Sequence, residues 1–116
     1  LKPQLDWDKL ILIGHSNGGD MTMLFATKYP HLINKAISMD HRRMIMPRTE
    51  KPRLYTLRGC DYDADAGVLP TKQEQEQFHM KVVKLDGITH SNMGENGTEE
   101  QHRLINQSIY GFLTQE

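Results

Sequence analysis

The run at residues 10–13, Leu-Ile-Leu-Ile, followed at once by Gly14, constrains this chain more than any other feature. Four apolar residues are too few for a helix, and an uninterrupted apolar run does not fit a strand with one solvent-exposed face. The run therefore fits a central strand of a parallel sheet, covered on both sides. After Gly14 the pattern changes, because residues 17–29 carry apolar residues at helical spacing and Pro30 marks their end. We predict a strand, a sharp turn and a helix in immediate succession.

The rest of the chain alternates strands and crossovers in the same way. Strands are predicted at residues 35–39, 53–58 and 80–85, a short polar helix at residues 71–78 and a last helix from residue 98. Both of these helices open with a capping-box pattern, Thr71 with Glu74 and Thr98 with Gln101. The alternation predicts an α/β fold with a mostly parallel sheet and flanking helices.

Length and composition exclude several classes of protein. The chain has 116 residues, which is one domain or a piece of a larger one. Its 14 Lys and Arg residues nearly balance 15 Asp and Glu residues, which argues against a nucleic-acid or anionic-membrane surface. No apolar run approaches the roughly 20 residues of a membrane span. The single cysteine, Cys60, excludes an internal disulfide and a four-cysteine zinc site, and nothing indicates a particular compartment.

Residues 14–18, Gly-His-Ser-Asn-Gly, fit the pattern G-x-S-x-G, which places a serine on a tight strand-to-helix turn with its hydroxyl exposed above the sheet. We expect a strained backbone at Ser16, and collisions if Gly14 or Gly18 carried a side chain. The three fixed positions alone occur by chance in roughly 4 % of chains, so the flanking strand and helix carry the prediction. A phosphate loop is disfavoured because neither G-x-G-x-x-G nor a Walker lysine is present.

With these neighbours, residues 10–20 resemble the nucleophile elbow of the α/β-hydrolase superfamily, especially its lipase- and esterase-like members. In that family the triad follows in the order serine, acid, histidine. The resemblance covers the whole chain but only the carboxyl-terminal half of the fold, with the four predicted strands matching the last four. It implies that residues 1–116 are a single, partial domain that needs the amino-terminal half. Residues 1–4 are neither a methionine start nor an export signal, which fits a cut inside a longer chain.

His90 follows the last predicted strand and precedes the last helix, where the family keeps its general base. A neutral imidazole there can take the Ser16 proton and return it to the leaving group. The other histidines lie in the motif, after a strand, or in or beside helices, and no pair has zinc-ligand spacing: His15, His31, His41, His79 and His102. The resemblance therefore assigns the base to His90.

Three aspartates crowd the loop after the third predicted strand: Asp61, Asp63 and Asp65. The family often has a glycine, an aspartate three residues later, and then an apolar residue and a proline. Here the residue three after Gly59 is Tyr62, so the loop holds extra residues. We favour Asp65 as the acid because Val68 and Pro70 follow it at nearly the usual distances.

Two other aspartates stay open as the acid. Asp63 is the second candidate, and Asp40, which ends the second predicted strand, is the third, because some family members carry the acid one strand earlier. The aspartate cluster also has the spacing of the first ligands of an EF-hand. However, Ala66 and Lys72 stand where that loop needs a glycine and a bidentate glutamate, which disfavours calcium.

The resemblance implies a serine hydrolase that cleaves a small acyl ester through an acyl-enzyme. Ser16 attacks, His90 moves the proton, Asp65 orients the imidazolium and the backbone N–H of Asn17 stabilises the oxyanion. No metal or organic cofactor is implied. Thioesterases and peptidases use the same groups. The second oxyanion donor normally comes from an upstream loop, and losing one donor costs about 100 to 1000-fold in rate, so we expect little catalysis from these residues alone.

The alternative is a non-catalytic module, either a hydrolase-fold fragment kept for binding or half of a split assembly. It rests on the strand at residues 10–13, whose far edge would be open without a partner from elsewhere. For the enzyme, residues 41–52 leave little room beyond the crossover, which predicts a site without a lid and favours short or accessible acyl esters. Met44, Met46 and Met93 are the candidates for substrate contact.

Overall fold

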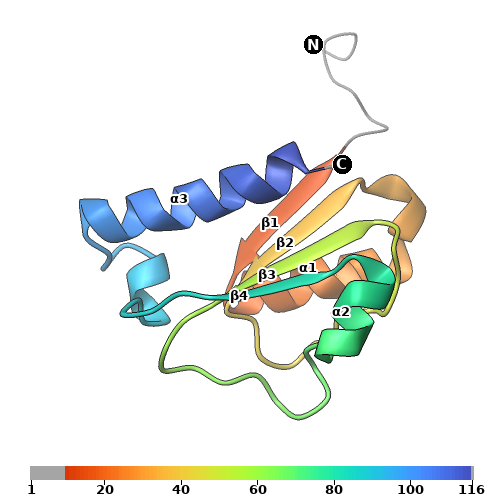
Figure 1. Cartoon of the computed structure of the whole chain (residues 1–116), viewed down its shortest axis with the longest axis horizontal. Helices are drawn as coiled ribbons and strands as arrows, with labels where there is room; N and C mark the ends of the chain where they lie inside the picture. The colour runs from red at the N-terminus through yellow and green to blue at the C-terminus, as the bar shows by residue number, and fades with distance from the viewer. Residues whose placement is uncertain (1–9, 116) are drawn as a thin grey trace, which may run out of the picture.

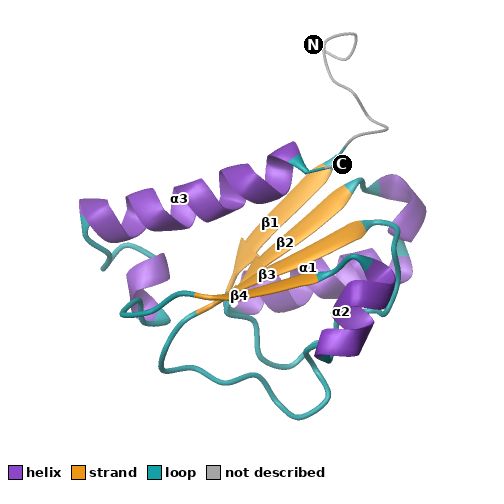
Figure 2. Cartoon of the chain, in the orientation of Figure 1, coloured by secondary structure: helices purple, strands orange, loops and turns teal. Residues whose placement is uncertain are grey.

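A computed structural model of the chain describes residues 10–115. Its strands form one parallel sheet in the order in which they occur along the chain: β1 (Ile11–His15), β2 (Lys35–Met39), β3 (Arg53–Arg58) and β4 (Lys81–Lys84). The helices are α1 (Asn17–Lys28), α2 (Lys72–Phe78) and α3 (Glu99–Thr114), with short 3-10 turns at η3 (Pro30–Leu32) and η4 (Ser91–Met93) (Figures 1 and 2). The predicted α/β fold with a parallel sheet is confirmed. The expectation for residues 1–4 lies outside the described residues.

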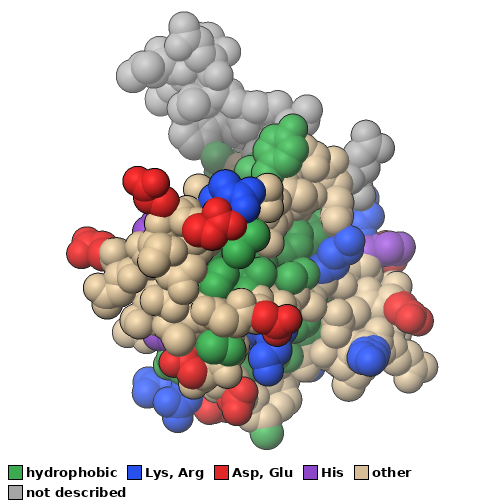
Figure 3. Space-filling view, turned by 60° about the vertical axis from the view of Figure 1, so that its left-hand side comes forward, with side chains coloured by type: hydrophobic (Ala, Val, Ile, Leu, Met, Phe, Trp, Pro, Cys, Tyr) green, Lys and Arg blue, Asp and Glu red, His purple; other side chains and the backbone are tan. Residues whose placement is uncertain are grey.

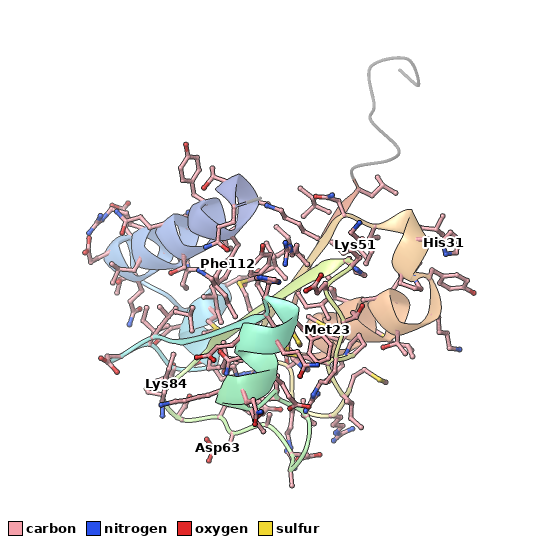
Figure 4. All side chains as sticks on the ribbon, turned by 45° about the vertical axis from the view of Figure 1, so that its right-hand side comes forward. Met23, His31, Lys51, Asp63, Lys84 and Phe112 are labelled. Atoms are coloured by element: carbon pink, nitrogen blue, oxygen red, sulfur yellow. The ribbon has the colours of Figure 1, made fainter. Side chains whose placement is uncertain are left out.

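Helices lie on both faces of the sheet, so the core has two halves. On one face α1 and α2 pack over a cluster that includes Met23, Ala36 and Leu54. On the other face α3 packs over β2 and β3, where the ring of Phe112 stacks on that of Tyr55 with 4.7 Å between centroids. Figure 4 shows Phe112 pointing from α3 toward the sheet. Burial on both faces is complete for β2 and β3, as is typical of the central strands of a parallel sheet.

Local signals fix the ends of the helices as predicted. The capping boxes at Thr71 and Thr98 are both present, each with its side chain and backbone bonded reciprocally to the third helical residue. At the other end of α3 the buried Lys35 donates from Nζ to the carbonyls of Phe112 and Leu113, at 2.7 and 2.9 Å. A cation at this position satisfies free carbonyls and the helix dipole, and it ties α3 to the start of β2.

The first strand differs from its prediction. It extends through Gly14 and His15, and it is an edge strand of the described sheet instead of a central one. Ile11 and Ile13 are 41 and 46 % exposed, because α3 covers β2 and β3 and leaves this part of the face open. Figure 3 shows hydrophobic side chains gathered on one face of the molecule and bordered by charged ones. A segment that covers the edge of β1 stays a prediction.

Parallel strands end at the same edge of the sheet, and this determines where the chemistry lies. The residues after β1, β2, β3 and β4 all emerge at the carboxyl edge, where open α/β sheets bind their ligands. Four segments therefore meet at this edge: Ser16, Asp40, the loop that begins at Gly59 and the loop that contains His90.

None of the helices within residues 10–115 combines the length and the apolar character that crossing a bilayer requires.

Candidate active site

Ser16 forms the turn between β1 and α1, with φ 58° and ψ −120°. A positive φ of this size is one that residues other than glycine seldom adopt. Backbone hydrogen bonds hold it there: the Ser16 N–H donates to the carbonyl of Met39 at 2.9 Å, and the Ser16 carbonyl accepts from the N–H groups of Gly19 and Asp20. The strained backbone predicted at Ser16 is confirmed, and the surrounding bonds impose it.

The glycines of this turn differ in what they do. A Cβ on Gly14 would lie 2.2 Å from the carbonyl oxygen of Gly18, so position 14 admits only glycine. A Cβ on Gly18 would meet nothing within 4 Å, and the predicted collision there is wrong. The second tight position is Gly19, whose Cβ would come within 3.0 Å of the Cβ of His41. Close packing of α1 on β1 and β2 therefore depends on positions 14 and 19.

Three side chains form a hydrogen-bonded chain at the carboxyl edge of the sheet. His90 Nε2 lies 3.0 Å from Ser16 Oγ, and His90 Nδ1 lies 2.9 Å from Asp40 Oδ2. The Asp40 side chain is fully buried, whereas that of His90 is 22 % exposed. A hydroxyl, an imidazole and a buried carboxylate in this order can pass the hydroxyl proton to the ring while the carboxylate stabilises the resulting imidazolium.

The favoured acid of the sequence, Asp65, is not at His90. Its Oδ1 lies 3.1 Å from Arg42 Nε in an ion pair whose two side chains are about half exposed. Asp63 is exposed as well, and Figure 4 shows it on the outer side of the loop after β3. The physical reason is that β2 lies next to β1, so the residue that ends β2 emerges beside Ser16, whereas the loop after β3 runs outward. Asp40, the third candidate, is the aspartate that contacts the imidazole.

Asp40 is held by the backbone on both sides. It has φ 59°, and its N–H donates to the carbonyl of Leu57 at 2.8 Å. The N–H of Gly59 donates to Asp40 Oδ1 at 2.7 Å, and a Cβ on Gly59 would come within 2.9 Å of Oδ2. Arg58 Nε lies 3.7 Å from Oδ1. A buried carboxylate requires such donors and a countercharge, because burying it alone is very costly.

Further contacts, which were not predicted from the sequence, orient His90. The ring of Tyr62 lies with its centroid 3.8 Å from that of His90, and the ring of His15 lies at 4.9 Å. The backbone of His90 is fixed too, because its N–H donates to Asp61 Oδ1 at 2.8 Å and its carbonyl lies 3.0 Å from His15 Nε2. The available signal was position, since His15 ends β1 and Asp61 lies three residues after β3, at this same edge.

Behind Asp40 lies a fully buried histidine. His41 Nδ1 is 2.5 Å from Ser38 Oγ, and Ser38 Oγ donates to Thr56 Oγ1 at 2.6 Å. Burial, together with the positive charge of Arg58, lowers the pKa of His41 from 6.5 to about 4. His41 is therefore neutral at neutral pH, and it belongs to the buried polar layer beneath the site.

Asn17 is the first residue of α1 and directly follows Ser16. The N–H groups of a first helical turn have no acceptor within their helix, so such a group is available to an anion. Its oxyanion role stays a prediction.

Two of the methionines expected near substrate are core residues instead, since Met46 and Met93 are buried. The third, Met44, packs against the core cluster beneath α1. Residues 10–115 contain no cluster of three or more His, Cys, Asp or Glu arranged for a metal ion.

Comparison with known proteins gives a distant similarity that agrees with this geometry. The chain is 28 % identical over 80 residues to a protein of Drosophila melanogaster named "Probable serine hydrolase". The match covers 69 % of this chain and 24 % of the fly protein, so the chain spans about a quarter of that relative. No family model matches the chain, and no solved structure matches it. The similarity supports a relationship to serine hydrolases.

Proposed function

We propose that this chain carries the catalytic residues of a serine hydrolase of the α/β-hydrolase type that cleaves acyl esters. Ser16 is the nucleophile, His90 the general base and Asp40 the acid, which replaces Asp65 of the sequence-based prediction. The observation that supports this most is the hydrogen-bonded chain from Ser16 Oγ through both ring nitrogens of His90 to Asp40 Oδ2. The strained turn at Ser16 adds support, because it exposes the hydroxyl at the carboxyl edge of the sheet.

In the proposed reaction Ser16 Oγ attacks the acyl carbonyl while His90 Nε2 takes the hydroxyl proton. The N–H of Asn17 stabilises the tetrahedral oxyanion. The intermediate collapses to the acyl-enzyme, and His90 gives its proton to the departing alcohol. Water then attacks the acyl group with His90 again as base, which frees the acid and restores Ser16. Throughout, Asp40 accepts the hydrogen bond from Nδ1–H and stabilises the imidazolium.

The substrate class proposed is a short or accessible acyl ester. The connection between β2 and β3, residues 40–52, contains no helix. A lid inserted at this point would need additional secondary structure. A chain-length series of nitrophenyl esters tests the proposal: hydrolysis should be fastest for the short acyl groups, and a maximum at long chains would contradict it.

The whole protein's activity is part of this proposal, since the chain spans about a quarter of the fly relative. A second candidate function is a non-catalytic module that binds through the open edge of the sheet. The observation in its favour is the exposure of Ile11 and Ile13 on β1, which another segment or chain would cover. Such a module would keep the geometry of Ser16 and His90 without turning over a substrate.

A fluorophosphonate probe separates the two functions. In the full-length protein we expect an adduct on the peptide that contains Ser16, identified by mass spectrometry, and its loss in Ser16→Ala. Ser91→Ala is the matched control, because Ser91 is an exposed serine directly after His90 and its loss should leave the labelling intact. A folded protein that shows no adduct at Ser16 would favour the module.

A further inference from the structure

We propose that Arg58 is a positioning residue for the proposed reaction: its buried guanidinium compensates the charge of Asp40 and keeps one carboxylate oxygen engaged, so that the other faces His90. This inference rests on the proposed function and adds a residue to it. Arg58 ends β3, and Asp40 follows β2, the neighbouring strand. The two residues therefore emerge side by side at the edge of the sheet where Ser16 lies.

The two oxygens of Asp40 have separate partners. Oδ1 accepts the N–H of Gly59 at 2.7 Å and lies 3.7 Å from Arg58 Nε. Oδ2 lies 2.9 Å from His90 Nδ1. Because Arg58 and Gly59 engage one oxygen, rotation of the carboxylate would cost both contacts. The orientation that serves His90 is therefore the one in which Asp40 is best stabilised.

Burial makes the ion pair more than a surface contact. Arg58 is 5 % exposed and Asp40 is fully buried, so water screens their attraction little. Arg58 Nη1 donates to Thr56 Oγ1 at 3.2 Å, while Nη2 has no hydrogen-bond partner among residues 10–115. Burial lowers the pKa of Arg58, but a guanidinium stays charged at neutral pH.

Charged and titratable groups surround this arginine from several elements. Besides Asp40, the carboxylates that act electrostatically on it are Asp20 from α1 and Asp63 from the loop after β3, and the phenol of Tyr62 from the same loop lies near them. His41 is buried beside it and neutral. Asp20 and Asp63 are not hydrogen-bonded to the guanidinium, so Asp40 is its one close carboxylate partner within the described part of the chain. Arg58 is thus the cation that balances Asp40 when His90 is neutral.

This arrangement predicts how proton uptake by the site responds to Arg58. The positive charge opposes binding of a proton to the pair of Asp40 and His90, whichever of the two takes it. If the charge is removed, the pair holds its proton more tightly, and His90 becomes available as a base only at higher pH. A charge within about 4 to 6 Å of one member of such a pair typically shifts the equilibrium by roughly one pH unit or more.

The test is the rate of fluorophosphonate labelling at Ser16 in the full-length protein, measured as a function of pH. In Arg58→Met we expect the midpoint of the acidic limb to move up by about one pH unit and the plateau rate to fall about tenfold. Arg58→Lys keeps the charge and should leave the midpoint close to that of the wild type. Arg42→Met, which removes an exposed arginine, is the matched control and should shift nothing. A folded Arg58→Met protein with an unmoved midpoint would overturn the proposal.

A double-mutant cycle excludes a merely structural role. In an Asp40→Asn background the carboxylate is gone, so Arg58→Met should change the labelling rate less than about twofold, and equal losses in both backgrounds would contradict us. If Arg58→Met does not fold, Arg58→Gln gives the same comparison, because it keeps a donor for Thr56 without the charge. If the wild-type protein is not labelled at Ser16, the proposed function itself is contradicted. If labelling depends on Asp40 but not on Arg58, only the inference about Arg58 is contradicted, and the proposed function stands.

Discussion

Two acidic turns leave the same edge of the sheet and differ in almost everything else. The turn after β2 contributes one aspartate, Asp40, which is fully buried in a left-handed backbone conformation against His90. The loop after β3 contributes three aspartates, all exposed, and Asp65 among them pairs with Arg42 in solvent. A single carboxylate with fixed donors around it meets the imidazole, while the crowded loop supplies charges that water already stabilises.

The difference teaches that burial, not the density of acidic residues, marks the aspartate able to serve a base. A carboxylate in solvent gains little from an ion pair and is free to rotate. A buried one must be hydrogen-bonded, and these bonds also fix its direction. This contrast between buried and exposed acidic residues predicts four effects of decreasing size.

The largest expected effect distinguishes Asp40 from Asp65. Asp40→Asn should lower the turnover of a short nitrophenyl ester by about ten-thousandfold, because the amide cannot stabilise the imidazolium and favours the wrong ring tautomer. Asp65→Asn should stay within about twofold of the wild type, since its ion pair is exposed. If Asp65→Asn abolished turnover and Asp40→Asn did not, the contrast would be reversed and the original sequence-based choice restored.

The second concerns the buried layer behind Asp40. Because the pKa of His41 is lowered from 6.5 to about 4, the folded state binds its proton less well than the unfolded chain does. The stability due to neutral His41 is therefore complete above about pH 6.5 and is lost as the pH falls toward 4. Across that window the loss amounts to about 3 kcal/mol. Urea unfolding of the full-length protein at several pH values measures it.

The control for this pH effect is His41→Asn, which can keep a bond to Ser38 but does not titrate. Its stability should fall less steeply than that of the wild type between pH 6.5 and 4. His31→Asn, at an exposed histidine, should follow the wild-type curve. Parallel curves for His41→Asn and the wild type would show that His41 does not carry the pH dependence.

The third tests the one aspartate of the loop after β3 that touches the base. Asp61→Ala removes the acceptor of the His90 N–H, a contact of 2.8 Å at an exposed position. We expect about 1 kcal/mol of lost positioning, measured as roughly a fivefold drop in ester turnover. Asp63→Ala is the matched control and should leave turnover unchanged. Equal losses in both variants would mean that the loop acts through its total charge.

The smallest effect concerns the exposed pair of Arg42 and Asp65. Arg42→Gln should change the free energy of unfolding by less than about 0.5 kcal/mol, because both side chains are about half exposed and water screens their attraction. Urea unfolding at neutral pH measures this. A loss as large as that expected for the buried His41 layer would remove the distinction between the two turns.

Most of the fold could be read from local signals. The strands at Lys35–Met39 and Arg53–Arg58 lie where predicted, as do the capping boxes at Thr71 and Thr98. Each of these depends on residues close together in the sequence, such as an apolar run or a cap three residues from its partner. The strand–turn–helix at Ser16 is local in the same sense. These elements can therefore be predicted from a single sequence.

The identity of the aspartate at His90 could not be read in this way. It depends on which strands are neighbours, on the outward course of the loop after β3 and on Arg58, which lies 18 residues from Asp40 in the chain. One signal was present: Asp40 directly ends a strand, and Arg58 is the cation that ends the next one. Two ionic residues at the ends of adjacent buried strands must compensate each other, and that reasoning favours Asp40 over Asp65.

The most direct test of the central claim is an experimental structure of the full-length protein after reaction with a fluorophosphonate. We predict phosphorus bonded to Ser16 Oγ, His90 Nε2 within hydrogen-bond distance of the adduct and His90 Nδ1 bonded to Asp40. An adduct on another residue, or a His90 ring that is out of reach of Ser16 or paired with an aspartate of the loop after β3, would contradict the account.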